Sequence, residues 1–200
     1  LGLKWDEELV YQSANTSVYK SYIDTLLKDN KAYMCFASKE ELEDVRNESN
    51  SFHYPGIWRD RDLGDINSEI KKGSPFTVRL KTPKEGKTSF QDLIYGNISV
   101  KNNEIDDFII VRSDGSPVYN LTNVVDDSSM EITHVIRGED HVSNTPKQIL
   151  IYLALGFKVP IFAHLPMILG DDKKRLSKRH GAAGVNEYES MGYQPDALLN

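Results

Sequence analysis

The sequence has 200 residues and a formal net charge of −6, with 39% hydrophobic and 27% charged residues. This length allows a sizeable hydrophobic core, and no stretch reaches the roughly eighteen consecutive apolar residues that a membrane helix requires. The single cysteine, Cys35, cannot form an internal disulfide and no secretion signal opens the chain, so we expect a globular cytoplasmic protein that does not enter a membrane.

Helical patterns come first along the chain. Apolar residues repeating at i, i+4 and i+8 predict a helix over 16–29. A short helix is expected over 39–48, which is rich in helix formers and acidic residues. Pro55 and Gly56 favour a loop over 50–64.

Strand patterns follow. Apolar and polar residues alternate over 78–81 and over 98–101, which predicts two half-buried strands. Residues 108–111 are all apolar and precede an Asp-Gly turn at 114–115, so a fully buried strand is expected there.

Helices and strands alternate in the second half of the chain. The expected order is helix 121–127, strand 132–136, helix 146–155 and strand 161–167, and a further helix is expected from Pro195 onward. Thr145 is a candidate N-cap, Pro146 suits the first turn, and Gly156 is placed to end the helix. Such alternation predicts βαβ units and a parallel sheet, preceded by a mixed α/β insertion over roughly 31–112.

Positive charge is concentrated in two places on this acidic chain. Residues 69–88 contain six basic and two acidic side chains, and residues 171–180 contain five and two. The net negative charge argues against a dedicated nucleic-acid binder, whereas local basic patches suit contacts with phosphates at defined places. Ordinary solvated surface explains each patch, taken alone, equally well.

The stretch DDKKRLSKR at 171–179 follows a predicted buried strand. Lysine and arginine on such a loop can stabilise the charge that grows on a transferring phosphoryl group. Composition alone favours the simpler interpretation of a basic surface loop.

The order of the residues in this stretch is more informative. RLSKR at 175–179 resembles the KMSKS signature of class I aminoacyl-tRNA synthetases, in the KLSKR form of the glutamyl enzymes. PVYNLTNVVDD at 117–127, the block at 132–156 and the block at 162–182 look like consecutive segments of bacterial-type glutamyl-tRNA synthetase, and the segments 1–7 and 11–33 resemble the part of that family just before its inserted domain. The resemblance implies an α/β fold: the second part of a doubly wound, Rossmann-type catalytic domain with an inserted mixed α/β acceptor-binding domain.

The resemblance also implies a domain organisation. It divides the chain into the end of the first half of the catalytic domain (1–30), the inserted acceptor-stem-binding domain (31–112), the second half of the catalytic domain (113–167), and the KMSKS loop with the start of the stem-contact region (168–200). Because the chain begins without methionine and stops inside an expected helix, we interpret it as an internal fragment. We expect it to lack the His-x-Gly-His half of the nucleotide site and the anticodon domain, and to be inactive by itself.

The implied activity of the intact enzyme is the ATP-dependent attachment of glutamate to tRNA(Glu) through glutamyl adenylate. Its substrates and partners would be glutamate, tRNA(Glu) and ATP, with Mg²⁺ accompanying ATP.

Three residues match the family's glutamate-binding positions, namely Tyr119, Asn123 and Arg137, with Arg137 facing the side-chain carboxylate. A guanidinium offers a rigid fork to a carboxylate, and an uncharged glutamine would leave it without a counter-charge. The residues alone leave another interpretation open, in which Arg137 forms a structural ion pair with Glu139 or Asp140.

Six residues match the family's ATP contacts, namely Asp140, His141, Ile168, Arg175, Ser177 and Lys178. Lys178 matches the second lysine of the signature, which contacts the ATP phosphates during adenylate formation, and is the candidate catalytic residue. Arg175 stands where the family usually has lysine, which preserves the charge but replaces a compact ammonium by a planar fork.

No metal site is predicted, zinc included. Cys35 lies where several bacterial relatives carry a Cys-x-Cys pair, and one cysteine cannot build a tetrahedral zinc site. The histidines, His53 among them, lack ligand spacing.

Other functions remain open at this point. The chain resembles, less closely, glutaminyl-tRNA synthetase and a shortened paralogue that glutamylates a modified tRNA base; the long insertion argues against the paralogue. A tRNA-binding or interaction module without catalysis is the alternative from a different class.

Overall fold

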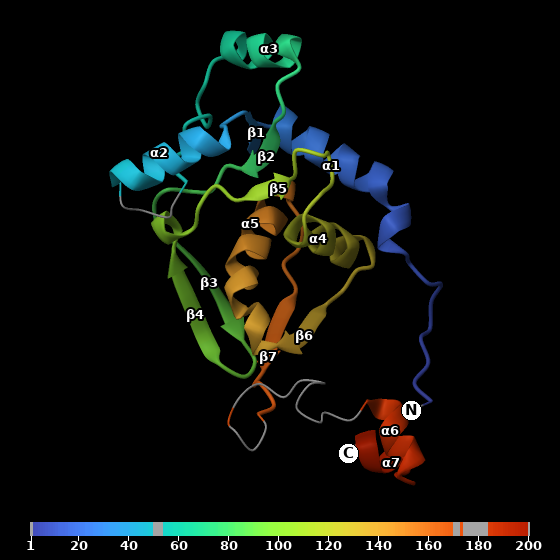
Figure 1. Ribbon diagram of the computed structural model, residues 1–200. Helices are drawn as coiled ribbons and strands as arrows, with labels where there is room; N and C mark the ends of the chain where they lie inside the picture. The colour runs from blue at the N-terminus through green and yellow to red at the C-terminus, as the bar shows by residue number, and fades with distance from the viewer. Residues whose placement is uncertain (1, 50–53, 170–172, 174–183, 200) are drawn as a thin grey trace.

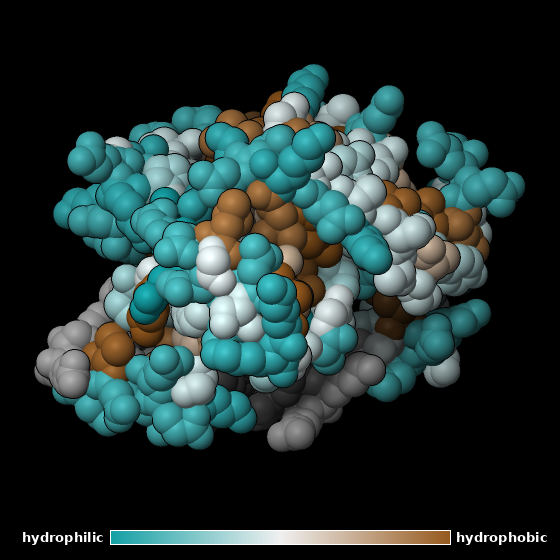
Figure 2. All heavy atoms as spheres, turned by 90° about the horizontal axis from the view of Figure 1, so that it is seen from above, coloured by the Kyte–Doolittle hydropathy of each residue, from teal (hydrophilic) through white to brown (hydrophobic). Residues whose placement is uncertain are grey.

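The computed structural model of the protein describes residues 2–49, 54–169, 173 and 184–199. Figure 1 shows two small sheets, with helices α1, α4 and α5 gathered around them. Hydrophilic side chains cover most of the face seen from above, and apolar ones show through in patches between them (Figure 2). Within the described ranges, no helix has both the length and the apolar character needed to cross a membrane.

The first sheet is antiparallel and contains β1 (Ala32–Cys35), β2 (Thr77–Leu80) and β5 (Ile109–Val111) in the order β1-β2-β5. The predicted strands at β2 and β5 are confirmed, whereas β1 was not predicted. The alternation that predicted β2 does not reflect its burial, because Arg79 is buried along with Val78 and Leu80. The Arg79 guanidinium stacks over the Tyr54 ring at 3.8 Å, which shields it from water.

The second sheet has the order β4-β3-β7-β6 and contains β3 (Lys87–Asp92), β4 (Gly96–Lys101), β6 (His134–Gly138) and β7 (Ile161–Leu165). β3 and β4 form an antiparallel hairpin, and β7 runs parallel to both β3 and β6. The predicted parallel βαβ unit is therefore confirmed as β6-α5-β7. β3 was missed because Thr88 and Asp92 occupy two of its buried positions, which hides the apolar alternation.

This second sheet joins the two main parts of the chain. The β3–β4 hairpin belongs to the expected 31–112 insertion, and β6 and β7 belong to the expected 113–167 segment. The domain limits themselves stay a prediction.

Three helices line the core, namely α1 (Thr16–Lys28), α4 (Tyr119–Ser129) and α5 (Thr145–Leu155). All three were predicted, and α5 ends at Gly156 in the left-handed conformation with φ 71°, as expected. The prediction of Thr145 as N-cap is wrong. Thr145 already has helical dihedral angles after the 3-10 helix η3 (Glu139–Asn144), and its hydroxyl contacts Arg137 and His164.

Two helices lie outside that core. The predicted α2 (Lys39–Ser49) is confirmed, and α3 (Leu63–Lys72) was not predicted. Within the expected 50–64 loop, residues 50–53 lie outside the described residues and Leu63 already starts α3. Asp62 caps α3 by accepting from the Asp65 amide, a signal that was readable in the sequence.

The remaining elements are short. They are η1 (Gln12–Ala14), η2 (Asn102–Glu104), α6 (Val185–Ser190) and α7 (Pro195–Leu199). α7 confirms the helix predicted from Pro195 onward.

Candidate active site

The candidate site lies near the carboxyl ends of the parallel strands β6 and β7, where ligands bind in open α/β sheets. Arg137 of β6 and His164 of β7 are register partners. The Arg137 Nε–H donates to His164 Nε2 at 3.2 Å. One terminal nitrogen of the same guanidinium donates to Thr145 Oγ1 at 2.8 Å and to the His141 carbonyl at 3.4 Å. The guanidinium is thus oriented by acceptors that carry no formal charge.

Two further predicted residues gather around this guanidinium. The Tyr119 ring, at the start of α4, lies 5.8 Å from the His141 ring. Burial lowers the pKa of the Arg137 guanidinium, and the neighbouring Tyr119 hydroxyl opposes that shift. The structure therefore brings Tyr119, Arg137 and His141 together from α4, β6 and η3.

Asn123 lies one turn further along the same helix. Because α4 begins at Tyr119, the spacing of four places Asn123 on the same side of the helix as Tyr119. The Asn123 side-chain oxygen accepts from Gln148 Nε2 of α5 at 3.0 Å, and Gln148 is buried. Gln148 was missed by the sequence analysis, because it stands between Lys147 and the apolar run 149–155 and no local pattern marks it as buried.

Glu139, one of the two carboxylates considered as a partner for Arg137, accepts its hydrogen bonds from other residues. It accepts from the Tyr95 hydroxyl and, at 3.0 Å, from the Met167 backbone N–H. The Tyr95 hydrogen bond lowers the pKa of Glu139. Glu139 thereby joins the β3–β4 turn to the segment that follows β7. Asp140, the other carboxylate, has an exposed side chain.

Asp92 and His164 form a buried pair that the sequence analysis missed. Their exposed fractions are 1% and 0%, and His164 Nδ1 lies 2.6 Å from Asp92 Oδ2. Asp92 Oδ1 accepts from the backbone amides of Ile94 and Tyr95 at 2.9 and 3.0 Å. Each residue is polar within a mostly apolar stretch, DLI and FAHL, and such positions signal a buried polar contact.

The ionised form of Asp92 is strongly favoured in the fold. Burial by itself raises its pKa, but hydrogen bonds from the Tyr95 amide, His164 and the Ile94 amide lower it to about 2. Relative to the usual value of 3.8, this shift corresponds to about 2 kcal/mol of stability. Because the folded-state pKa is the lower one, that stability is present above about pH 4 and lost as the pH falls toward 2.

We expect the difference in free energy of unfolding between the wild type and Asp92→Asn to depend on pH, because only the wild type has the Asp92 carboxylate. It should narrow by about 2 kcal/mol between pH 5 and pH 2, since asparagine does not titrate. Urea unfolding at a series of pH values measures this difference. A difference that stays constant over the interval would contradict the assignment.

The remaining ATP-binding predictions fall on or near the basic stretch. Arg175, Ser177 and Lys178 lie outside the described residues. Ile168 is described and is 74% exposed. Lys173, within the basic stretch, is exposed and has a φ of 59°.

The basic residues of 69–88 do not form one patch. Arg79 is buried, and Lys81 donates to Asn30 and contacts Asp60. Lys71 and Lys72 are exposed on α3, at the top of Figure 1, whereas Lys87 is exposed at the start of β3, which lies below the first sheet in that view. The charge excess that the sequence shows is therefore divided among separate places.

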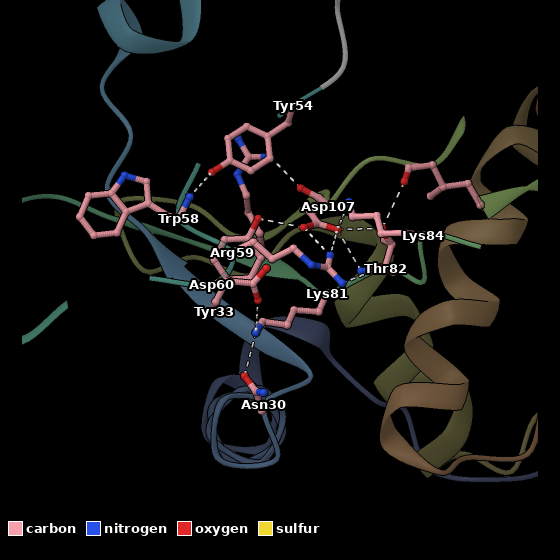
Figure 3. A network of polar contacts seen from close by, with 12 residues as sticks. Asn30, Tyr33, Tyr54, Trp58, Arg59, Asp60, Lys81, Thr82, Lys84 and Asp107 are labelled. Carbon is pink, nitrogen blue, oxygen red and sulfur yellow. Dashed lines mark hydrogen bonds and ion pairs between the residues drawn. The ribbon is translucent and has the colours of Figure 1, made fainter. Parts of the chain in front are cut away.

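A second buried carboxylate, Asp107, organises this region (Figure 3). Asp107 is 0% exposed and receives the Arg59 guanidinium at 2.5 and 2.6 Å. It also accepts from the Thr82 backbone N–H and hydroxyl at 3.0 and 2.7 Å, and from the Tyr33 hydroxyl at 3.0 Å. Lys84 Nζ lies 3.3 Å away. Burial raises the pKa of Asp107, but the bonds from Arg59 and Thr82 outweigh it, and the net shift is downward.

Cys35 lies beside this network, with its Sγ 3.2 Å from the Tyr54 hydroxyl. In the part of the chain that the structure describes, no cluster of three or more His, Cys, Asp or Glu side chains has the arrangement of a metal site. The expectation of no zinc stays a prediction.

The fold and the site define a class: half of a doubly wound α/β domain that presents a fixed guanidinium at the carboxyl ends of its parallel strands. The sequence matches the family described as tRNA synthetases class I (E and Q), catalytic domain, over residues 1–200. The chain belongs to this family, which confirms the fold class and the resemblance inferred from its motifs.

Individual proteins of this family are also similar to the chain. Glutamate–tRNA ligase 1 of Caldanaerobacter subterraneus subsp. tengcongensis is 50% identical, over 100% of this chain and 42% of that protein. The glutamate–tRNA ligase of Geotalea uraniireducens is 53% identical with the same coverage. A crystal structure of a glutamate tRNA ligase from Elizabethkingia meningosepticum, in complex with its amino acid, has a TM-score of 0.79 at 32% identity, covering 94% of this chain and 39% of that one. The chain thus spans about 42% of the length of these curated relatives.

Proposed function

We propose that the full-length protein containing this chain attaches glutamate to tRNA(Glu) in an ATP-dependent reaction. The glutamate α-carboxylate attacks the α-phosphate of ATP, which releases pyrophosphate and forms glutamyl adenylate. The glutamyl group then passes to the terminal adenosine of the tRNA. No covalent enzyme intermediate is needed, so the protein contributes positioning and charge stabilisation.

The observation that carries this proposal is the oriented Arg137 guanidinium. It is partly buried, and the side chains that hold it in place, His164 and Thr145, carry no formal negative charge in this arrangement. Such a cation favours a ligand carboxylate as its counter-charge. We assign Arg137 to the glutamate side-chain carboxylate, with Tyr119 and Asn123 completing the glutamate site.

ATP would enter as its Mg²⁺ complex and be bound by residues of η3 and of the basic stretch. Asp140 and His141 are assigned to the adenosine and the Ile168 backbone to the adenine. Arg175, Ser177 and Lys178 are assigned to the phosphates, with Lys178 as the catalytic residue. The family membership and the position of η3 directly after β6 support these assignments.

The 31–112 segment is proposed to hold the acceptor end of the tRNA through backbone contacts and base stacking. Because its basic residues are divided among separate places, the exposed Lys71, Lys72 and Lys87 are the candidates for phosphate contacts, and Arg79 is not.

Glutamate-dependent exchange of labelled pyrophosphate into ATP tests the function, using the full-length protein with tRNA present. Exchange that occurs with glutamate and not with glutamine supports the proposal. Exchange with glutamine instead would indicate a glutaminyl enzyme. tRNA binding without exchange would leave the tRNA-binding module, and transfer of glutamate to a tRNA base would indicate the modifying paralogue.

Arg137→Ala is expected to raise the KM for glutamate by about 30- to 4,000-fold, because truncating one member of a buried charge pair costs about 2–5 kcal/mol. Selection against glutamine should also weaken, because the glutamate carboxylate would no longer have a charged partner. The exchange assay measures both effects. Arg112→Ala, which removes an exposed arginine at the turn after β5, is the matched control and should change the KM less than about twofold. Unchanged selectivity in Arg137→Ala would refute the assignment.

A further inference from the structure

Three side chains from three strands form one continuous hydrogen-bonded row, from Asp92 at the end of β3 through His164 of β7 to Arg137 of β6. We propose that Asp92 and His164 are positioning residues for glutamate recognition, because Asp92 holds His164 in the tautomer whose Nε2 accepts from Arg137. This inference rests on the proposed function, because it names the residues that aim the guanidinium of the same site.

The hydrogen bonds of His164 define its tautomer. The Arg137 Nε–H always carries its proton, so the His164 Nε2 atom 3.2 Å away accepts. His164 Nδ1 then carries the ring proton and donates it to Asp92 Oδ2 at 2.6 Å. A proton on Nε2 would instead point at the guanidinium N–H and repel it.

Packing holds the ring but does not select between tautomers. The His164 ring stacks on Phe162, with centroids 6.2 Å apart and planes inclined by 13°, and meets Phe90 edge-on at 6.3 Å. These aromatic rings contact the imidazole whichever nitrogen carries the proton. The choice of tautomer therefore falls to Asp92 and, at the other nitrogen, to Arg137 and Thr145.

The backbone around Asp92 explains why a carboxylate is required. Asp92 Oδ1 accepts from the amides of Ile94 and Tyr95, and from the His164 amide at 3.4 Å. In Asp92→Asn these backbone donors require the amide oxygen at the Oδ1 position. The NH₂ group then takes the Oδ2 position and faces His164 Nδ1, which must become an acceptor. The ring proton moves to Nε2 and opposes Arg137.

The consequence for recognition follows from geometry. A planar guanidinium distinguishes a carboxylate from an amide only when its N–H groups are held in a defined direction. A misdirected guanidinium binds glutamate more weakly and rejects glutamine less. We expect Asp92→Asn to raise the KM for glutamate by about 10- to 100-fold, with the KM for ATP changed less than about twofold.

The test uses the full-length protein and two independent readouts. The imidazole ¹⁵N chemical shifts report the tautomer of His164 directly, with His164→Gln as the variant that assigns the signal. The wild type should show the Nδ1–H form and Asp92→Asn the Nε2–H form. Pyrophosphate exchange then measures the KM for glutamate and for ATP. Asp114→Asn is the matched control, because Asp114 also accepts a backbone N–H at a turn, from Ser116; it should change neither readout.

A double variant separates positioning from simple structural support. Combined with Arg137→Ala, Asp92→Asn should add less than about twofold to the KM for glutamate, because it acts through Arg137. Additive effects, an unchanged tautomer, or an unchanged KM in folded Asp92→Asn would each overturn the proposal. Absence of glutamate-dependent exchange in the wild type would overturn the proposed function instead, and the ¹⁵N shifts would still decide whether Asp92 sets the tautomer.

Discussion

Lys178→Ala in the full-length protein is expected to slow adenylate formation by about 10²- to 10³-fold, because it removes a cation that meets the charge growing on the transferring phosphates. The KM for glutamate should change less than about threefold, since Lys178 is not assigned to the amino acid. Pyrophosphate exchange measured at saturating ATP and varied glutamate separates the two effects.

A matched control removes a positive charge from the same stretch. Lys173→Asn suits this purpose because Lys173 has a left-handed backbone with φ 59°, a conformation that asparagine tolerates. The pyrophosphate-exchange rate of Lys173→Asn should stay within about threefold of the wild-type rate. If Lys173→Asn and Lys178→Ala lowered the exchange rate equally, the stretch would attract ATP through its total charge and Lys178 would have no specific role.

Asp107→Asn is expected to lower the free energy of unfolding by about 3–5 kcal/mol, the usual cost of breaking a buried ion pair. Asparagine keeps the size of the side chain but places an NH₂ group among Arg59, Thr82 and Tyr33, which all donate to the carboxylate. Urea unfolding of the two forms at neutral pH measures the difference.

Asp60→Asn is the control for this second prediction. Asp60 belongs to the same network (Figure 3), but its side chain is 80% exposed and its contact with Lys81 is 3.3 Å long. Water screens such a pair, so we expect a change within about 0.5 kcal/mol. If the two variants lost the same stability, the buried carboxylate would not be the centre of the network.

Local signals predicted the elements whose residues follow a regular period. α1 has apolar residues at helical spacing. α5 is apolar throughout 149–155, and the proline near its start and the glycine after it mark its ends. β3 was not predicted, because its buried face carries Thr88 and Asp92 as well as Phe90 and therefore shows no apolar alternation. Polar side chains buried among their own hydrogen-bond partners carry no hydrophobic period, so patterning misses them.

The candidate site was predictable to a limited extent. Family resemblance singled out Tyr119, Arg137 and His141, and the structure brings these three together. It did not single out Asp92 or His164. These two residues are 72 positions apart, and only the pairing of β3 with β7 places them in contact.

The sequence by itself determined the family, the βαβ order of the second half and the basic stretch that includes Lys178, because motifs and periodicity are properties of neighbouring residues. The tertiary structure alone decided which polar residues meet: Asp107 with Arg59, Glu139 with Tyr95, and Asp92 with His164. It also removed Arg79 from the expected basic patch by burying it. The physical reason is that burial and hydrogen bonding depend on which strands lie side by side, and that arrangement is set by the whole chain.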